Sequence, residues 1–169
     1  MRQTTHATIR SFRRKDANDI SRMMKELASF HGDAIRANPN HFIKHCLSRK
    51  KIARAWIALR DKQAAGFLVA YDRMNFVNGQ KTCVIDLLYV NEAFRRQSVG
   101  QALLAAAAQD AIRHGCETFL VTAQPGNATA NNFYEKLGLN RETKTSARYR
   151  CDKDGIKKLA RHATPQRVR

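Results

Sequence analysis

The stretch FRRQSVGQALL, residues 94–104, decides how the rest of this chain is interpreted. It follows the apolar run 84–90, which has the composition of a strand, and it opens an alanine-rich run that is typical of a helix. A strand, a tight loop and a helix N-terminus bring unpaired main-chain N–H groups and the positive end of the helix dipole to one spot. Arg95 and Arg96 add charge-assisted donors that suit a pyrophosphate better than a lone carboxylate. The stretch therefore predicts a binding site for a phosphorylated ligand.

Hydrophobic periodicity and turn residues predict alternating strands and helices along the remaining chain. The expected strands are 7–12, 54–59, 65–71, 82–90 and 118–122, with one or two more within 139–151. The expected helices are 16–30, 39–48, 99–114 and 127–137. Their boundaries are Asp16 and Pro39 as start signals and Gly32, Gly115 and Gly138 as stop signals. A polar turn at 61–63 and the pair Asn78-Gly79 predict hairpins, so the pattern favours one α/β domain with a mixed sheet.

Length and composition limit the class of protein. The 169 residues, 43% of them apolar, are enough for a single domain, which we expect to span 1–169 with its core in 7–160 and a basic tail at 163–169. No apolar run reaches the roughly 18 residues of a membrane span, and the N-terminus lacks the apolar segment of a signal peptide. The four cysteines contain no CxxC pair, which indicates reduced thiols and a cytoplasmic location.

The charge is high for a protein with one anionic ligand. Lys and Arg number 31 against 14 Asp and Glu, a net charge of +17 that is concentrated in 44–62 and after Arg141. Such a surface attracts polyanions, including nucleic acid. Because no RNA- or DNA-binding motif accompanies the charge, we favour a solvated basic surface over nucleic-acid binding.

Two motifs together resemble the GNAT family of N-acetyltransferases over about residues 7–160. The run 95–100, RRQSVG, is similar to the family's acetyl-CoA signature R/Q-x-x-G-x-G/A, and Asn127 with the run 132–138, NFYEKLG, is similar to its N-x-x-A-x-x-F/L-Y-x-x-x-G-F helix. Within the family, the runs KELASFHG, VIDLLYV and RYRCDKDGI resemble the diamine and polyamine acetyltransferase branch. The resemblance implies a mostly antiparallel mixed sheet flanked by helices, with a splay between the strand ending near Val90 and the strand near 118–122.

The resemblance also implies how acetyl-CoA would be held as co-substrate. Main-chain N–H groups of the loop and helix start would bind the pyrophosphate, the strand edge would pair with the pantetheine arm and polarise the thioester carbonyl, and Asn127 would hydrogen-bond the pantetheine. The implied cofactor-binding residues are Leu88, Tyr89, Val90, Arg95, Arg96, Gln97, Ser98, Val99, Gly100, Gln101, Asn127 and Tyr134. Ser98 departs from the family pattern, which has glycine there. A serine keeps the amide donor but costs free energy if its φ is positive.

Direct acetyl transfer to an amine needs a base and an acid. An alkylammonium has a pKa near 10.4, so its proton must be removed before attack. Asp86, a carboxylate inside an apolar strand, is the candidate base, acting directly or through a water; holding a cationic substrate or forming a structural pair are its alternative roles. Tyr134 is the implied general acid that protonates the leaving thiolate; an aromatic pair with Phe133 that only packs is the alternative.

Other features are given less weight. His41 and His45 have the i, i+4 spacing of metal ligands, but no third ligand is apparent, so we expect no metal. The expected acceptor is a diamine, a polyamine or a lysine-like amino acid, to which Glu26, Asp33 and Asp86 would offer acidic groups. Antibiotic or protein amines, and a non-catalytic acyl-CoA-binding or nucleic-acid-associated module, remain alternatives. A homodimer is also open.

Overall fold

The computed structural model describes residues 7–31, 38–124, 126–142 and 154–155. Contacts between residues divide the chain into two compact units, Met1–Asn131 and Asn132–Arg169, which are described separately. No helix in the described ranges combines the length and the apolar character that a membrane crossing needs.

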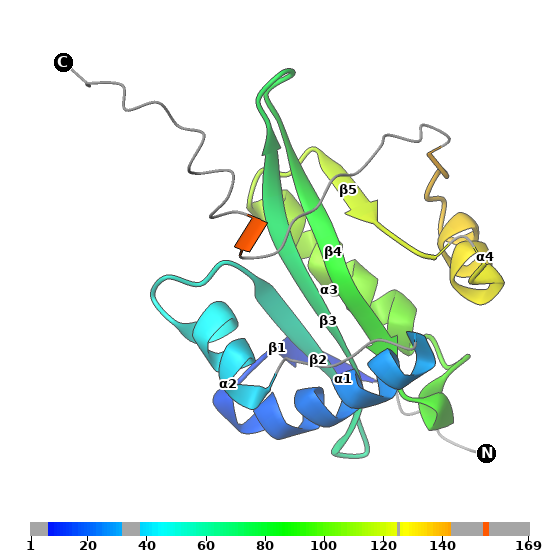
Figure 1. The fold of residues 1–169 in the computed structure, drawn as a ribbon. Coiled ribbons are helices and arrows are strands. Elements are labelled where there is room, and N and C mark those ends of the chain that lie inside the picture. Colours follow the sequence, from blue (N-terminus) through cyan, green and yellow to red (C-terminus); the bar gives the residue numbers. More distant parts are fainter. Residues whose placement is uncertain (1–6, 32–37, 125, 143–153, 156–169) are drawn as a thin grey trace. The chain divides into compact units, whose positions relative to one another are not determined.

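The first unit is built on a five-stranded sheet with the order β1-β2-β3-β4-β5 among the described residues (Figure 1). The strands are β1 Thr8–Ser11, β2 Arg54–Arg60, β3 Gln63–Asn75, β4 Gln80–Val90 and β5 Thr118–Val121. The first four pair antiparallel, and β5 pairs parallel to β4. The sheet is therefore mixed and mostly antiparallel, as predicted.

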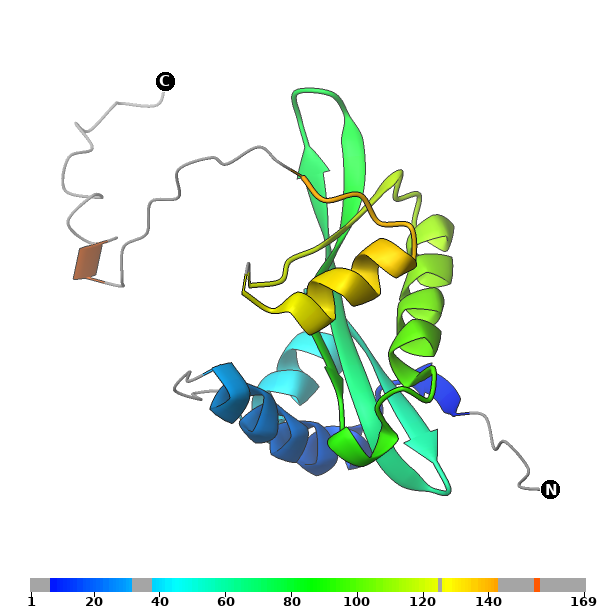
Figure 2. The ribbon, with the colours of Figure 1, turned by 90° about the vertical axis from the view of Figure 1, so that its right-hand side faces the viewer.

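Helices cover both faces of this sheet (Figure 2). In the first unit they are α1 Ala17–His31, α2 Pro39–Phe42 continued by the π-helical turn Ile43–Leu47, and α3 Val99–Arg113. A further helix, α4 Ala128–Lys136, begins in the first unit and ends in the second, and it is described by itself. On one face, Ile20 and Met23 of α1 pack with Ile57 and Phe67 of the sheet. On the other face, α3 buries the apolar side of its run; the buried residues are Val99, Leu103, Leu104, Ala107 and Ala111.

The turns follow the sequence signals. Asp61 and Lys62 both have positive φ, 48° and 66°, which is the backbone of a two-residue hairpin turn between β2 and β3. Gly79, with φ 72°, closes the hairpin between β3 and β4. This hairpin is longer than predicted, because Asp72 to Asn75 extend β3 by pairing with Cys83 to Gln80.

Two sequence predictions concern Asp16, expected at the start of the first helix, and the strands expected within 139–151. Asp16 precedes α1, and its buried carboxylate accepts hydrogen bonds from the Arg13 N–H at 2.7 Å and from the Arg10 guanidinium at 2.7 and 2.8 Å. For the strands expected within 139–151, residues 139–142 are described and are not in a strand, while 143–151 lie outside the described residues.

Candidate active site

The loop after β4 leads directly into the N-terminus of α3. The first helical bond runs from the Ala102 N–H to the Ser98 carbonyl at 3.0 Å, so the N–H groups of residues 99–101 have no partner inside the helix. No side chain caps this end, and its first turn has no acidic residue. The positive helix end therefore has no capping side chain and no acidic neighbour in its first turn, the features that favour an anion there.

Two non-glycine residues of the loop have left-handed backbone. Arg96 has φ 57°, and Ser98, where the family signature has glycine, has φ 60° and ψ 10°. An L-residue in this region costs roughly 1–2 kcal/mol relative to right-handed helix. The loop thus has, at Ser98, a conformation that a glycine would adopt more easily.

Gln97 ties the loop to the sheet. Its Oε1 accepts a hydrogen bond from Arg60, at the end of β2, and its Nε2 donates to the Ala93 carbonyl at 2.9 Å. Arg95 donates from Nε to the Val90 carbonyl at 3.2 Å. Side chains therefore hold the loop in place. The main-chain N–H groups of the loop are not the groups that make these contacts.

One edge of β4 is open beside this loop. The pairing of β4 with β5 runs from Thr82↔Thr118 to Ile85↔Val121 and no further. Residues 86–90 of β4 therefore have a strand neighbour on the β3 side only, within the part of the chain that the structure describes. This is the splay that the sequence resemblance implies, and it leaves Leu88, Tyr89 and Val90 without a described strand partner on the side of β5.

Asp86 stands at an irregularity in β4. The register passes from Val69↔Leu87 to Ala70↔Ile85, which leaves Asp86 as an extra residue on β4. Such a β-bulge redirects a side chain relative to the regular alternation. Here both Asp86 and its neighbour Leu87 face a cavity of about 650 Å³ that also contains Asp72 and residues of α1 and α2.

The cavity is mostly apolar around the Asp86 carboxylate. Its walls include Met24, Phe42, Val69 and Leu87. Asp86 has no hydrogen-bond or ion-pair partner among the described residues. Its carboxylate is open to the cavity, yet the surrounding protein displaces part of its water, and this loss of solvation raises the pKa of Asp86 above the ordinary value.

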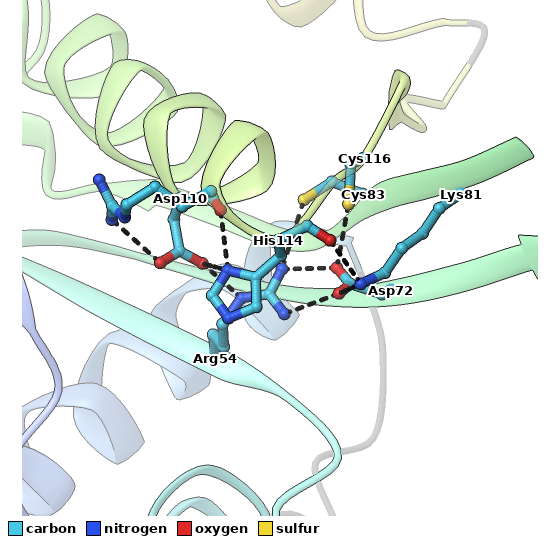
Figure 3. Close-up of polar contacts among 8 residues, drawn as sticks. Arg54, Asp72, Lys81, Cys83, Asp110, His114 and Cys116 are labelled. Carbon is cyan, nitrogen blue, oxygen red and sulfur yellow. Dashed lines mark hydrogen bonds and ion pairs between the residues drawn. The ribbon is translucent and has the colours of Figure 1, made fainter.

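A second aspartate on the cavity wall has the opposite environment (Figure 3). Asp72 of β3 lies 2.5 and 3.1 Å from the guanidinium nitrogens of Arg54 and 3.0 Å from the Lys81 Nζ. Arg54 Nε also lies 2.6 Å from Asp110 Oδ2 of α3, and Asp110 pairs with His114 at 3.3 Å. Hydrogen bonding to Arg54 is the main cause of a pKa of Asp72 well below its usual range.

Two cysteines adjoin this ion cluster. Cys116 donates from Sγ to Asp72 at 3.5 Å, and Cys83 Sγ lies 4.0 Å from Arg54. Burial raises the pKa of the Cys83 thiol to about 11, so the thiolate is disfavoured at neutral pH. The three described cysteines, Cys46, Cys83 and Cys116, are all free thiols.

Tyr89 links the sheet to α1. Its phenol donates to Glu26 Oε2 at 2.7 Å, and burial together with this hydrogen bond raises the pKa of Tyr89 to about 12. Glu26 also accepts a hydrogen bond from Arg22 at 3.3 Å. Glu26 is therefore already engaged, and it does not line the cavity that contains Asp86. Asp33, the other acidic group expected near the acceptor, lies outside the described residues.

The remaining predicted site residues are Asn127, directly before α4, and Tyr134 within it. Asn127 Oδ1 accepts a hydrogen bond from the Ala130 N–H at 3.0 Å and so caps the N-terminus of α4. Tyr134 belongs to the second unit, where its carbonyl accepts from the Leu139 N–H at 3.1 Å and its ring lies 5.3 Å from that of Phe133. Burial raises the pKa of the Tyr134 phenol.

The structure brings together residues that the sequence did not connect. Asp72 and Tyr71 come from β3, and His41 and His45 come from α2 and the turn after it, yet all four line the cavity of Asp86. Only the spacing of the two histidines was visible in sequence, where the lack of a third ligand argued against a metal site. Among the described residues, no three His, Cys, Asp or Glu side chains are grouped as metal ligands.

Comparisons with known proteins identify the family of the chain. Residues 20–139 match the acetyltransferase (GNAT) family. The chain is 28% identical to thialysine N-epsilon-acetyltransferase of Mus musculus, covering 90% of this chain and 96% of the relative. It is also 28% identical, over 99 residues, to aminoglycoside N(6')-acetyltransferase type 1 of Salmonella typhimurium, covering 57% of this chain and 68% of the relative.

The fold has close counterparts among solved structures. AAC(6')-Iy in complex with the bisubstrate analog CoA-S-monomethyl-acetylneamine superimposes with a TM-score of 0.73 at 23% identity, covering 86% of this chain and 99% of that one. The fold is thus shared with proteins of low sequence identity. With the family match spanning most of the chain, it follows that the chain belongs to the GNAT family and is an N-acetyltransferase.

Proposed function

We propose that the chain transfers the acetyl group of acetyl-CoA directly to a primary amine of a small molecule, a lysine-like amino acid or a diamine. The observation that carries this proposal is Asp86: an unpaired carboxylate at a β-bulge, on the wall of an apolar cavity and next to the open part of β4. A cationic amine fits this carboxylate, and its hydrocarbon arm fits the apolar wall.

The chain has groups suited to acetyl-CoA at two places. The N–H groups of residues 97–101, with Arg95 and Arg96 nearby, suit a pyrophosphate. The open edge at Leu88, Tyr89 and Val90 suits the amides of a pantetheine arm, which would pair as an added strand. Asn127 uses its Oδ1 as a helix cap, so the amide NH₂ is the part of its side chain that we assign to the pantetheine.

In the transfer step, the Asp86 carboxylate takes a proton from the bound ammonium, directly or through a water. The neutral amine nitrogen then attacks the thioester carbonyl carbon, and main-chain N–H groups at the β4 edge stabilise the oxyanion that forms. When the C–S bond breaks, Tyr134 donates its phenolic proton to the CoA sulfur. The raised pKa of Asp86 makes it a stronger base, and the raised pKa of Tyr134 keeps its proton in place at neutral pH.

The experiment is release of free CoA thiol from acetyl-CoA with a panel of amines: thialysine, lysine, cadaverine, putrescine, spermidine and an aminoglycoside. We expect turnover with one or more of the small aliphatic amines and none with the amine omitted. Retention on RNA that falls with salt, without thiol release from any amine, would instead favour a nucleic-acid-associated module.

A variant control shows that the thiol release comes from this protein and not from a contaminating host enzyme. Asp86→Asn removes the proposed base, and Asp61→Asn is the matched control, because Asp61 is an exposed turn residue and asparagine tolerates its positive φ. Thiol release that survives in Asp86→Asn as well as in Asp61→Asn would contradict the assigned role of the cavity.

We also propose a cellular location and a domain extent for the protein. Free thiols at Cys46, Cys83 and Cys116 support a reducing, cytoplasmic location. We propose that residues 1–169 form one acetyltransferase domain.

A further inference from the structure

The cavity of Asp86 contains two imidazoles that the proposed chemistry does not use. His41 of α2 and His45 of the following π-helical turn both line it, and their ring centroids are 6.4 Å apart. His114, outside this cavity, pairs with the Asp110 carboxylate. Neither His41 nor His45 has a carboxylate partner among the described residues. Their N–H groups are therefore donors without an anionic acceptor.

Local structure fixes both residues. The Nδ1 atom of His41 accepts a hydrogen bond from the Asn38 N–H at 3.4 Å, so a neutral His41 bears its proton on Nε2. The His45 carbonyl accepts from the N–H groups of Ile52 and Ala53 at 2.9 and 3.1 Å, which anchors the turn to the chain that enters β2. The His41 ring is thus held by a main-chain donor, the main chain of His45 is anchored, and each imidazole can donate from the ring in either protonation state.

The charges of the cavity are not those of a polycation site. Asp72 is already neutralised by Arg54 and Lys81, so Asp86 is the carboxylate left for one cationic group. A second ammonium would find no second free carboxylate among the described residues that line the cavity. The net charge of +17 also opposes the approach of a polycation.

We infer that His41 and His45 bind the carboxylate of the acceptor, and that the acceptor is a zwitterionic amino acid whose distal amine is presented at Asp86. This inference rests on the proposed function and sharpens its substrate class. One anion of the protein meets the ammonium, and two imidazole donors meet the carboxylate. An apolar wall that includes Val69 and Leu87 accommodates the methylene arm.

Four amines, arranged as two pairs that each differ only by a carboxylate, test the inference. L-Lysine and cadaverine differ by the carboxylate alone, and so do 6-aminohexanoate and pentylamine; each pair is compared by kcat/KM in CoA thiol release, with the lysine product assigned by mass spectrometry. A hydrogen bond to a charged group is worth enough to give about a tenfold preference for the carboxylate in each pair. We expect that preference, and acetylation of the lysine side-chain amine.

The double variant His41→Gln/His45→Gln should bring both ratios close to one, while kcat/KM for cadaverine stays within about threefold of wild type. Glutamine at residue 41 retains a capping-box side chain, so α2 keeps its N-terminal structure, and thermal unfolding checks the fold. Lys44→Gln is the matched control, since it removes a cation from the same turn outside the cavity. It should leave the ratios unchanged.

The outcomes distinguish a failure of the proposed carboxylate site from a failure of the proposed acetyltransferase activity. Cadaverine used as well as or better than lysine by wild type, or ratios that the double variant does not change, would overturn the carboxylate site while leaving the acetyltransferase intact. Absence of thiol release with every amine would overturn the proposed function and this inference with it.

Discussion

Asp72 and Asp86 lie on neighbouring strands and line the same cavity, yet their environments differ in one respect. Asp72 has Arg54 at 2.5 Å and Lys81 at 3.0 Å, whereas Asp86 has no partner among the described residues. The pKa of Asp72 falls well below the ordinary value of a carboxyl, and the pKa of Asp86 rises above it. The comparison shows that the presence or absence of charged partners decides in which direction the pKa of a carboxyl on this cavity wall shifts.

The β-bulge explains why the two residues diverge. Regular pairing holds Asp72 opposite Cys83, within reach of Arg54 on β2 and Lys81 on β4. The extra residue in β4 takes Asp86 out of that pattern and into the cavity. A bulge costs pairing, and here it leaves an anion where an ammonium can approach it.

Asp86→Asn should have the largest effect on activity. Asparagine cannot accept the ammonium proton, so kcat should fall about 10²- to 10⁴-fold, the usual contribution of a general base. Binding of acetyl-CoA, measured by calorimetry, should not change, because the proposed pyrophosphate donors lie at α3. Asp61→Asn should retain wild-type kcat. An unchanged kcat in Asp86→Asn would remove the difference in role between Asp72 and Asp86.

Tyr134→Phe separates the acid from the base. Loss of the phenolic proton should lower kcat about 10²-fold or more while the KM for acetyl-CoA changes little. Steady-state kinetics at saturating amine measure both. Phe133→Leu is the packing control, and it should lower stability more than kcat. A Tyr134→Phe variant with full kcat would leave Tyr134 as a packing residue.

Arg54→Gln tests the paired carboxylate through stability. With side-chain exposures of 17% for Arg54 and 19% for Asp72, the pair is neither fully buried nor at the surface. We therefore expect a loss of about 2–3 kcal/mol in the free energy of unfolding, between the values for surface and buried pairs. Urea unfolding gives this number, and Arg22→Gln on the exposed face of α1 should cost at most about 0.5 kcal/mol.

The pH dependence of that loss has a definite sign. Because the folded pKa of Asp72 is lowered, its stabilisation is present above the unfolded pKa of about 3.9 and is lost as the pH falls through the folded pKa. The difference between wild type and Arg54→Gln should thus be constant near pH 6 and shrink below about pH 4. A difference that grows on acidification would contradict the assignment.

Ser98→Gly should have the smallest effect. Glycine removes the cost of the positive φ, roughly 1–2 kcal/mol, and adds an entropic cost of about 0.5–1 kcal/mol, so stability should rise by about 0.5 kcal/mol. Acetyl-CoA should bind at least as tightly. Ser98→Ala keeps the strain and loses only the hydroxyl, so a loss of acetyl-CoA affinity in Ala and in Gly alike would mean that the hydroxyl itself contacts the ligand.

The sequence predicted the elements that depend on local signals. The alternation of strands and helices, the hairpin at Asn78-Gly79 and the helix from Val99 are all present in the structure. The extension of β3 to Asn75 was missed, because its pairing with β4 depends on a partner strand and not on the composition of residues 72–75. The bulge at Asp86 was missed for the same reason: register is a property of two strands.

The ion cluster and the cavity were beyond sequence reasoning. Arg54, Asp72 and Asp110 are separated by many residues, and no spacing rule connects them. The cavity joins His41 and His45 to Asp86 only because α2 packs on the same face of the sheet as the bulge. The roles of Asp86, of Tyr134 and of the acetyl-CoA residues stay predictions that the experiments above address.

The most direct test of the account is the pH dependence of kcat/KM for the acceptor amine in wild type and Asp86→Asn, side by side. Ionisation of the free amine affects both proteins equally, so the difference between the two profiles isolates Asp86. We expect an acidic limb in wild type, set by a pKa above the ordinary 3.9 of aspartate, and its absence from a much slower Asp86→Asn. Two profiles of the same shape and height would contradict the account.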